Sequence, residues 1–285
     1  MIPEYSFYAK LSQLVLNMTQ PAKKPKLVRL LLYYLSSLKF VVIIKNWYLI
    51  SLGYLKILDF SSGKYSLELF NGLKFYVGHF MDAWAIKEVF GENDYRLGVV
   101  KKKQTIIDIG ANIGTFTVLS AISNTKATVI CFEPSKPTFK LLQKNIQVNN
   151  LADRVFHNQM AVGGEKGILK LFNSGPSGLR SLFRVRSEQN YEMVSVTTLK
   201  DIFHKYKINR CDYLKIDCEG AEYAILESCP EQILKSIKHI SLEFHEMLPS
   251  QKHHHLIDIL ENVGFKITHS YNKIENNIGY IYAYR

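Results

Sequence analysis

The segment Thr105-Ile-Ile-Asp-Ile-Gly-Ala-Asn-Ile-Gly-Thr-Phe116 joins a short apolar run to a glycine turn and then to an apolar-periodic stretch. An apolar run of this length is typical of a strand buried on both faces, and the periodicity that begins at Thr115 is typical of a helix. The order predicts a parallel strand, a tight turn and a helix, as in a doubly wound α/β sheet.

The glycine spacing and one acid restrict the ligand that fits this turn. Gly110 and Gly114 form G-x-x-x-G, whereas dinucleotide-binding turns carry G-x-G-x-x-G. Asp108, at the strand end, would repel a pyrophosphate but suits a positively charged ligand. S-adenosylmethionine has an ammonium group, a sulfonium, a ribose and no phosphate, so we expect this cofactor. The alternative is a glycine turn of the kind found in any α/β enzyme.

A second acid supports the same cofactor. The apolar run Ala127–Phe132 ends at Glu133, which lies 23 residues after Gly110. An acid at the end of the second strand, about 20 residues beyond the glycine turn, can accept hydrogen bonds from ribose hydroxyls. The alternative is a solvated acid at the start of the next helix, where the helix dipole favours it.

Strands and helices alternate along the rest of the chain. A hairpin is predicted at 66–77 around Asn71-Gly72, preceded by a strand at 56–60 and followed by a helix at 82–90 that stops at Gly91. Further strands are expected at 154–162, 212–217, 239–244, 265–270 and 279–284, with an extra β pair at 167–172 and 191–196. This alternation predicts a mostly parallel sheet with helices on both faces and a terminal hairpin that adds one antiparallel strand.

Acidic residues end the later strands as well. Asp217 and Glu219 follow the strand at 212–217, and Glu243 and His245 end the strand at 239–244. The carboxyl ends of parallel strands meet at one edge of a sheet, so we expect these four side chains around a substrate. His245 has the intrinsic pKa of a base near neutral pH, and crowded carboxylates acquire raised pKa values. Lys215 lies two residues before Asp217 and is expected to pair with it.

Two other chemistries could use this edge of the sheet. Three oxygen ligands and a histidine could hold a divalent cation, but we predict no metal site. The motif [D/N]-P-P-[Y/F] supports methylation of exocyclic amines on nucleic acid bases. This sequence lacks the motif and has Asp217-Cys-Glu-Gly220 in its place, which indicates a different acceptor. No nucleic-acid-binding module accompanies the positive charge either, so no nucleic acid partner is expected.

The net charge of +11 is concentrated at the start of the chain, where residues 1–60 hold eight lysines and arginines against two acids. The apolar stretch 27–44 contains Arg29 and Lys39, which makes it a poor membrane span. Two interpretations stay open for residues 27–59: helices that cover the active site, or a basic amphipathic element on an anionic membrane. We divide the chain into this helical segment (1–60), a β-hairpin and helix (61–100) and the main domain (101–285).

The compartment follows from the cysteines. Cys131, Cys211, Cys218 and Cys229 lack C-x-x-C spacing, and three fall in or beside apolar runs, which favours buried reduced thiols. The first twenty residues lack the basic start and apolar core of a secretory signal. We therefore expect a cytoplasmic protein, with peripheral membrane contact through residues 1–60 as the open alternative.

The combined motifs resemble those of the FkbM-family methyltransferases. The resemblance is carried by Ile107–Gly114, Cys131–Pro134, Leu214–Glu222 and Glu243–His245, with Thr197–Leu199 and the stretch 82–95 also fitting. It implies a class I, Rossmann-like fold with a seven-stranded sheet and O-methylation of sugars, glycolipids or other hydroxylated metabolites.

The resemblance also implies residue roles. It places Asp108, Gly110, Asn112, Gly114 and Glu133 at the cofactor, and Asp217, Glu219, Glu243 and His245 at the transfer site; we assign Asp217 to the cofactor as well. The third strand ends in Gln159-Met-Ala161, with no acid for the adenine amine, so Gln159 or backbone groups would have to bind it.

These observations predict an S-adenosylmethionine-dependent O-methyltransferase acting on a small-molecule or glycan hydroxyl. An NAD-dependent oxidoreductase on a similar sheet is a second hypothesis, which the glycine spacing and Asp108 disfavour. A non-catalytic, cofactor-binding membrane adaptor is a third, which the acids after the later strands disfavour.

Overall fold

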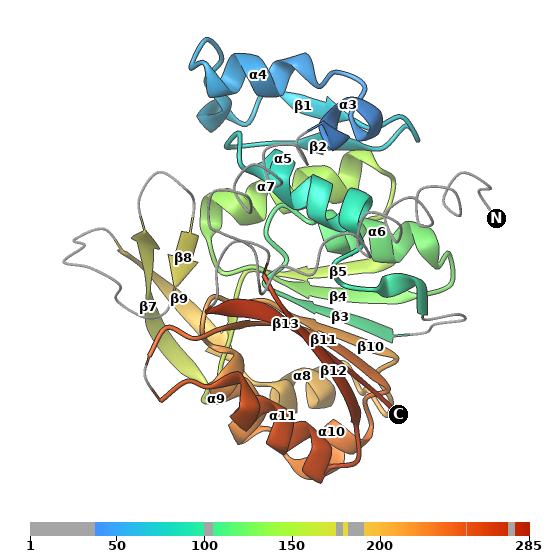
Figure 1. Ribbon diagram of the computed structural model, residues 1–285, viewed down its shortest axis with the longest axis vertical. Helices are drawn as coiled ribbons and strands as arrows, with labels where there is room; N and C mark the ends of the chain where they lie inside the picture. Colours follow the sequence, from blue (N-terminus) through green and yellow to red (C-terminus); the bar gives the residue numbers. More distant parts are fainter. Residues whose placement is uncertain (1–37, 100–104, 175–178, 182–190, 249, 273–276) are drawn as a thin grey trace.

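The computed structural model describes residues 38–99, 105–174, 179–181, 191–248, 250–272 and 277–285. A seven-stranded sheet forms the centre of the molecule (Figure 1). The strand order is β12-β13-β11-β10-β3-β4-β5, and only β13 runs antiparallel to its neighbours. This confirms the predicted sheet and its terminal hairpin. The strands are β3 (Thr105–Ile109), β4 (Thr128–Phe132), β5 (Val155–Asn158), β10 (Tyr213–Ile216), β11 (His239–His245), β12 (Lys266–Tyr271) and β13 (Ile278–Tyr284).

Helices cover both faces of the sheet (Figure 1). On one side lie α6 (Thr115–Ser123) and α7 (Lys136–Val148); on the other lie α8 (Leu199–Lys205), α9 (Glu222–Ser228), α10 (Glu231–Lys235) and α11 (His253–Asn262). Pro137, in the first turn of α7, has a backbone that suits a helix start and no N–H that would be left unbonded there. The result is a three-layer α/β architecture.

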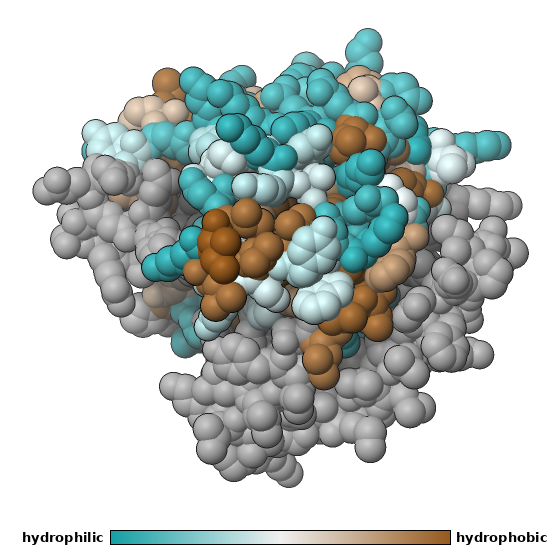
Figure 2. Space-filling model, turned by 90° about the horizontal axis from the view of Figure 1, so that it is seen from above, coloured by the Kyte–Doolittle hydropathy of each residue, from teal (hydrophilic) through white to brown (hydrophobic). Residues whose placement is uncertain are grey.

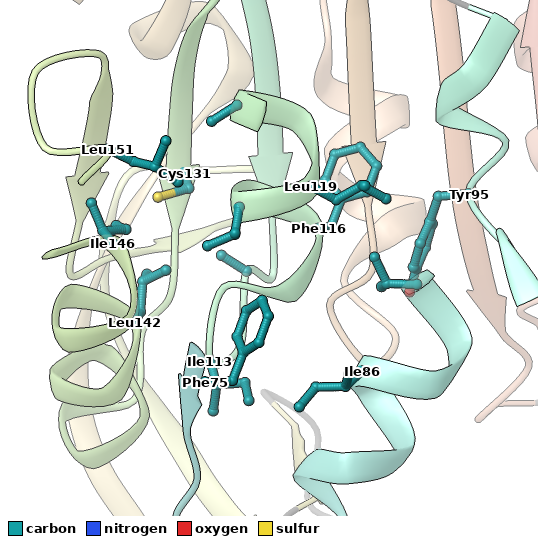
Figure 3. Packing of buried hydrophobic residues seen from close by; sticks show 14 of the residues in the cluster. Phe75, Ile86, Tyr95, Ile113, Phe116, Leu119, Cys131, Leu142, Ile146 and Leu151 are labelled. Atoms are coloured by element: carbon teal, nitrogen blue, oxygen red, sulfur yellow. The ribbon is translucent and has the colours of Figure 1, made fainter. Parts of the chain in front are cut away.

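The central strands are buried on both faces, which explains their continuous apolar runs. Two apolar clusters form, one on each face of the sheet. Figure 3 shows the first cluster, in which Phe116 and Leu119 of α6 and Leu142 and Ile146 of α7 pack beside Cys131 of β4. All four cysteines are free and three of them are buried, as expected.

A smaller unit, formed by residues 38–99, extends this first cluster away from the sheet. It contains α3 (Lys39–Ile43), α4 (Tyr48–Tyr54), the one-turn helix η2 (Phe60–Ser62), the hairpin β1 (Ser66–Glu68) and β2 (Lys74–Tyr76), α5 (Asp82–Ile86), the π-helix η3 (Lys87–Glu92) and the one-turn helix η4 (Leu97–Val99). The hairpin around Asn71-Gly72 is confirmed. Phe40 of α3 stacks on Trp84 of α5, with ring centroids 4.5 Å apart, which fixes α3 against the rest of the unit.

Two predictions for this unit were wrong. Residues 56–60 form no strand: the backbone of Lys56 is left-handed (φ 58°), and the Asp59 carboxylate accepts the N–H of Ser61 to start η2. The helix predicted to stop at Gly91 continues as η3 to Glu92, and the next residue, Asn93, has a left-handed backbone with a φ of 55°. Gly91 is a packing position, because a Cβ there would lie 2.4 Å from the Cδ1 atom of Ile43.

The strand predicted at 154–162 is divided between two sheets. β5 ends at Asn158, and Ala161–Val162 forms β6, which pairs with β9 (Tyr191–Thr197) in a sheet ordered β6-β9-β7-β8. The extra β pair is confirmed as β7 (Gly167–Ser174) against β9, and β8 (Leu179–Ser181) extends it. The chain leaves the first sheet at Gln159-Met160, beside the end of β4.

No helix in the described part of the chain has both the length and the apolar character needed to cross a bilayer. The predicted helical segment 1–60 is described only from residue 38 onward, and its first 37 residues lie outside the description. The division of the chain into three parts stays a proposal.

Asn145 of α7 ties the hairpin to the glycine turn, and its replacement gives a first test of the packing. Its side chain is fully buried. The side-chain oxygen accepts a hydrogen bond from the N–H of Tyr76, and the side-chain nitrogen donates to the carbonyls of Tyr76 and Ile113. Asn145→Ala should lower the free energy of unfolding by about 1–3 kcal/mol, because buried backbone groups lose their partners. Thermal unfolding measures the loss.

Asn149 is the matched control, because it makes the same kind of bonds to the N–H and carbonyl of Lys74 at the exposed end of α7. Water can replace those bonds, so Asn149→Ala should cost clearly less than Asn145→Ala. Equal losses would contradict the linking role given to Asn145.

Candidate active site

The glycine turn lies where the chain order of the sheet reverses. β4 and β5 follow β3 on one side, and the chain then returns to place β10 on the other side. Ligands of open α/β sheets bind at the carboxyl ends of the strands at such a point. Gly110 has a φ of 74°, and a Cβ on it would lie only 1.6 Å from the carbonyl oxygen of Asp217. Only glycine lets the turn after β3 approach the end of β10 this closely.

Glu133 binds this turn from the end of β4. One carboxylate oxygen accepts the N–H of Asn112 at 3.0 Å, and the other accepts the N–H of Ser135 at 2.9 Å. Asn112 itself has a left-handed backbone (φ 52°) and an exposed side chain. Together they border a cavity of about 120 Å³ whose apolar walls include Phe132, Met160 and Leu171.

Gly114 serves packing. It begins α6 with a φ of 91°, and a Cβ there would lie 2.6 Å from the Cδ1 atom of Leu142 on α7. The glycine therefore lets the start of α6 approach α7 closely.

Two further predicted cofactor residues, like Gly114, lie outside this cavity. Asp108 is fully buried; its Oδ2 accepts the Thr117 hydroxyl at 2.6 Å, and its Oδ1 lies 3.4 Å from the ammonium of Lys215. Burial outweighs Lys215 and Thr117 and raises the pKa of Asp108. Gln159 is exposed and lines neither cavity of the site, whereas its neighbours Met160 and Ala161 do line the smaller one.

The four residues predicted around the substrate come together in a second, larger cavity of about 600 Å³. Asp217, Glu219, Glu243 and His245 all line it, from the carboxyl ends of β10 and β11. The far wall comes from the unit 38–99 and α7. Gly110, Asn112, Asp217 and Glu219 border both cavities, so the two meet at the glycine turn.

Lys215 is the buried cation behind this junction. Its ammonium lies 3.3 Å from Asp217 and 3.4 Å from Asp108, and it donates to the carbonyl of Gly110 at 2.6 Å. The predicted pairing with Asp217 is confirmed. Burial alone would raise the pKa of Asp217, but Lys215, His245 and a hydrogen bond from Tyr95 outweigh burial and hold this pKa below its usual value. Asp217 is therefore a carboxylate at neutral pH.

Tyr95 links two of the acids. Its hydroxyl donates to Oδ2 of Asp217 at 2.9 Å and lies 3.3 Å from Oε2 of Glu243. Burial, together with the charge of Asp217, raises the pKa of Glu243 well above its usual value. The Tyr95 hydroxyl has one hydrogen, which it donates to Asp217. A protonated Glu243 can therefore donate the hydrogen bond between Glu243 and the Tyr95 oxygen.

His245 is held from both sides by acids. Its Nδ1 lies 3.1 Å from Oε1 of Glu222, and its Nε2 lies 3.6 Å from Oε2 of Glu219. Glu222 is fully buried, and the same oxygen accepts the N–H of Cys218. Burial lowers the pKa of His245, but Glu222 and Glu219 more than reverse that effect and raise it well above its usual value. The imidazole is thus protonated at neutral pH in the free protein.

Sequence reasoning missed three residues of this site. Glu222 has a sequence signal only as the last residue of the resembling segment Leu214–Glu222. Tyr95 lies in a loop without periodicity, and its one signal is its place in the resembling stretch 82–95. Glu88, on η3, also lines the larger cavity, and burial together with Asp94 raises its pKa to about 8. Among the described residues, no three His, Cys, Asp or Glu side chains form a group that could hold a metal ion.

Comparison with protein families identifies one match. The family described as the methyltransferase FkbM domain matches residues 108–267, more than half of the 285 residues. The match includes the glycine turn and the strand ends that carry Glu133, Asp217 and His245.

Individual relatives are distant. "Methyltransferase sdnD" of Sordaria araneosa is 26% identical over 213 residues, which cover 64% of this chain and 81% of that protein. "31-O-demethyl-FK506 methyltransferase FkbM" of Streptomyces tacrolimicus is 25% identical, with coverage of 56% and 74%. "Hexuronic acid methyltransferase AglP" of Haloferax volcanii is 24% identical, with coverage of 60% and 70%. A crystal structure of methyltransferase FkbM from Methylobacillus flagellatus KT aligns at 15% identity with a TM-score of 0.49, covering 67% of this chain and 46% of that one.

Proposed function

The chain belongs to the FkbM family of methyltransferases and is a methyltransferase (EC 2.1.1.-), and from this premise we propose that it transfers a methyl group from S-adenosylmethionine to a hydroxyl oxygen. The acceptor is a hydroxyl of a saccharide, a glycolipid or another hydroxylated metabolite. Family membership excludes the NAD-dependent oxidoreductase that the sequence left open.

The meeting of the two cavities supports this proposal most strongly. A cavity of about 120 Å³ beside Glu133 joins one of about 600 Å³ at Gly110, Asn112, Asp217 and Glu219. Methyl transfer from a sulfonium is an in-line displacement, which needs a donor and an acceptor held on either side of one junction. Asp217, a carboxylate at that junction, is complementary to a positively charged donor.

The residues of the smaller cavity fit the adenosine end of the cofactor. Phe132, Met160 and Leu171 offer apolar walls for a flat base. Glu133 also lines this cavity, and a carboxylate accepts hydrogen bonds of the kind that ribose hydroxyls donate. Asn112, Gly110 and Asp217 would hold the amino-acid end, while Asp108 and Gly114 shape the turn from behind. When bound, the cofactor supplies an electrophilic methyl group on a sulfonium.

His245 is the proposed proton acceptor for the acceptor hydroxyl. It lines the larger cavity, and the buried carboxylate of Glu222 orients it through Nδ1. Because His245 is protonated in the free protein at neutral pH, this role requires loss of that proton at higher pH or upon binding. Glu243 and Glu219 would position the substrate by hydrogen bonds.

The acceptor class rests on chemistry and on similarity to relatives. Carboxyl groups, an imidazole and Tyr95 are hydrogen-bonding groups that suit a polyhydroxylated ligand. One relative's name refers to a hexuronic acid and another's to the O-demethyl form of FK506. A cytoplasmic location, with contact to an anionic membrane through residues 1–60, completes the proposal.

Calorimetry with S-adenosylhomocysteine, the expected product, tests the cofactor site. The intact chain should bind it, and Glu133→Ala should weaken binding about 10- to 100-fold, as expected for a lost hydrogen bond to a charged group. Glu165→Ala, at an exposed acid outside both cavities, is the control and should bind normally. Equal affinity in the two variants would remove Glu133 from the site, and no binding by the intact chain would overturn the cofactor proposal.

A further inference from the structure

The unit 38–99 exposes an unusual concentration of apolar side chains. Of the seventeen large hydrophobic side chains that are exposed among the described residues, nine lie between residues 38 and 70, on or beside α3 and α4 and in the segments that follow them. Figure 2 looks down on this end of the molecule and shows apolar and pale aromatic side chains gathered beside hydrophilic ones. We call this surface the apolar end; it consists of Leu38, Val41, Val42, Trp47, Tyr48, Tyr54, Leu55, Ile57 and Phe70.

The apolar end is one surface and not several scattered positions. The N–H of Phe70 bonds the carbonyl of Ile43, so the tip of the β1–β2 hairpin lies against the end of α3. The N–H of Lys45 likewise bonds the carbonyl of Glu68. The opposite side of the same helices is buried: Phe40 of α3 is buried and stacks on Trp84, and Ile50 of α4 is buried. One face of α3 and α4 packs on the enzyme and the other faces outward.

The charge around the apolar end has one dominant sign. Residues 38–77 contain five lysines and two acids. Lys45, Lys56, Lys64 and Lys74 are exposed, although Lys45 also lies 3.6 Å from Glu68, and Lys39 pairs with Glu92 on the inner side. Exposed apolar side chains, Trp and Tyr rings and lysines on one surface are the combination found where proteins lie on anionic bilayers.

The apolar end also lies close to residues that line the larger cavity. Tyr54 packs edge-to-face on Phe80, and the neighbouring His79 lines that cavity. From Leu55 the chain reaches Ser61, Ser62 and Gly63 within a few residues, and all three line the cavity too. A membrane or protein bound to the apolar end would therefore lie next to the wall of the larger cavity that residues 61–63 and His79 form.

We propose that the apolar end docks on an anionic membrane surface and that the acceptor is a membrane-bound glycolipid whose hydroxylated headgroup enters the larger cavity from there. This inference deepens the proposed function and rests on it for the acceptor, whereas the docking itself is independent of methyl transfer.

Flotation of the full chain with lipid vesicles tests the docking. The protein should float with vesicles of phosphatidylcholine that contain one quarter phosphatidylglycerol, and much less with phosphatidylcholine alone. Added salt should weaken the binding, because it screens the lysines. Leu55→Glu combined with Ile57→Glu should reduce vesicle binding by about tenfold or more, since two apolar contacts are replaced by charges that the surface repels.

Ile168→Glu is the matched control, because Ile168 on β7 has the same exposed fraction as Ile57, 65%. It should bind vesicles like the unmodified chain, and all variants should bind S-adenosylhomocysteine equally, which shows that they are folded. Failure of the unmodified chain to float, or equal flotation of the double variant, overturns the docking. So does a dimer in solution that the double variant dissociates, because a second copy would then cover the apolar end. Vesicle binding by a chain that binds no S-adenosylhomocysteine would instead refute the proposed function and leave the docking intact.

Discussion

Gly110→Ala is expected to reduce the affinity for S-adenosylhomocysteine by about 100-fold or more and to remove methyl transfer, because an added Cβ forces the turn after β3 away from β10. The Cβ would lie 1.6 Å from the carbonyl oxygen of Asp217, which is backbone and cannot rotate aside. Gly110 and Asp217 both border the two cavities, so a shift there disturbs the donor and acceptor sides together. Calorimetry gives the affinity, and thermal unfolding shows whether the variant is folded.

Gly264→Ala is the control that distinguishes the effect of the Cβ clash at Gly110 from the effect of placing alanine in a left-handed backbone conformation. Gly264 also has a left-handed backbone, with a φ of 91°, but a Cβ there would meet no atom within 4 Å. Its replacement should cost about 1–2 kcal/mol of stability and leave ligand affinity unchanged. If Gly110→Ala binds S-adenosylhomocysteine as Gly264→Ala does, the close approach of β3 and β10 is not what shapes the cofactor site.

His245→Ala should lower kcat by about 10²- to 10⁴-fold, the usual contribution of a general base, while binding of S-adenosylhomocysteine is retained. In the intact enzyme kcat/KM should rise with pH, because His245 must lose the proton that Glu222 and Glu219 help to retain. An unchanged rate in His245→Ala would remove this residue from the mechanism.

Glu222→Gln tests the positioning role of the buried acid without touching the cavity. The variant removes the charge that most raises the pKa of His245, so the rising limb of the pH profile should move to lower pH by about one unit or more. A residue that only filled space would leave the limb where it was, and an unmoved limb would contradict the assignment.

The same pair predicts how stability depends on pH. The folded-state pKa of His245 lies above its usual value of 6.5, so its ion pairs stabilise the fold fully at lower pH, and this contribution is lost as pH rises through the raised pKa. Because glutamine cannot form such an ion pair, Glu222→Gln should show a weaker fall in thermal stability at alkaline pH than the unmodified chain. Parallel stability curves would contradict the ion pairing.

The residues at the strand ends could be predicted because a parallel sheet brings them to one edge. Asp217, Glu219, Glu243 and His245 needed only the order of strands to be placed together. The burial of the Asp108 side chain could not be predicted in the same way, because it depends on the register between β3 and β10. Asp108 and Lys215 are direct neighbours across β3 and β10, and this pairing turns the carboxylate toward the ammonium and away from the cavities.

The unpredicted parts of the site come from segments without a regular pattern. Tyr95 reaches Asp217 across 122 residues of chain, from a loop that the fold of the unit 38–99 holds in place. Glu88 faces the larger cavity from a π-helix, a geometry that hydrophobic periodicity does not indicate. The broken strand at Gln159-Met160 likewise results from pairing with a distant strand, β9.

Transfer of a ¹³C-labelled methyl group tests the central claim most directly. The full chain is incubated with S-adenosylmethionine labelled at its methyl carbon and with pools of saccharides, glycolipids and small hydroxylated metabolites, and the products are examined by ¹³C NMR. We predict a methyl signal with the chemical shift of a methyl ether, formed by the unmodified chain and greatly reduced in His245→Ala. Label found on nitrogen or carbon, or no transfer to any hydroxyl by a chain that binds S-adenosylhomocysteine, would contradict O-methylation at this site.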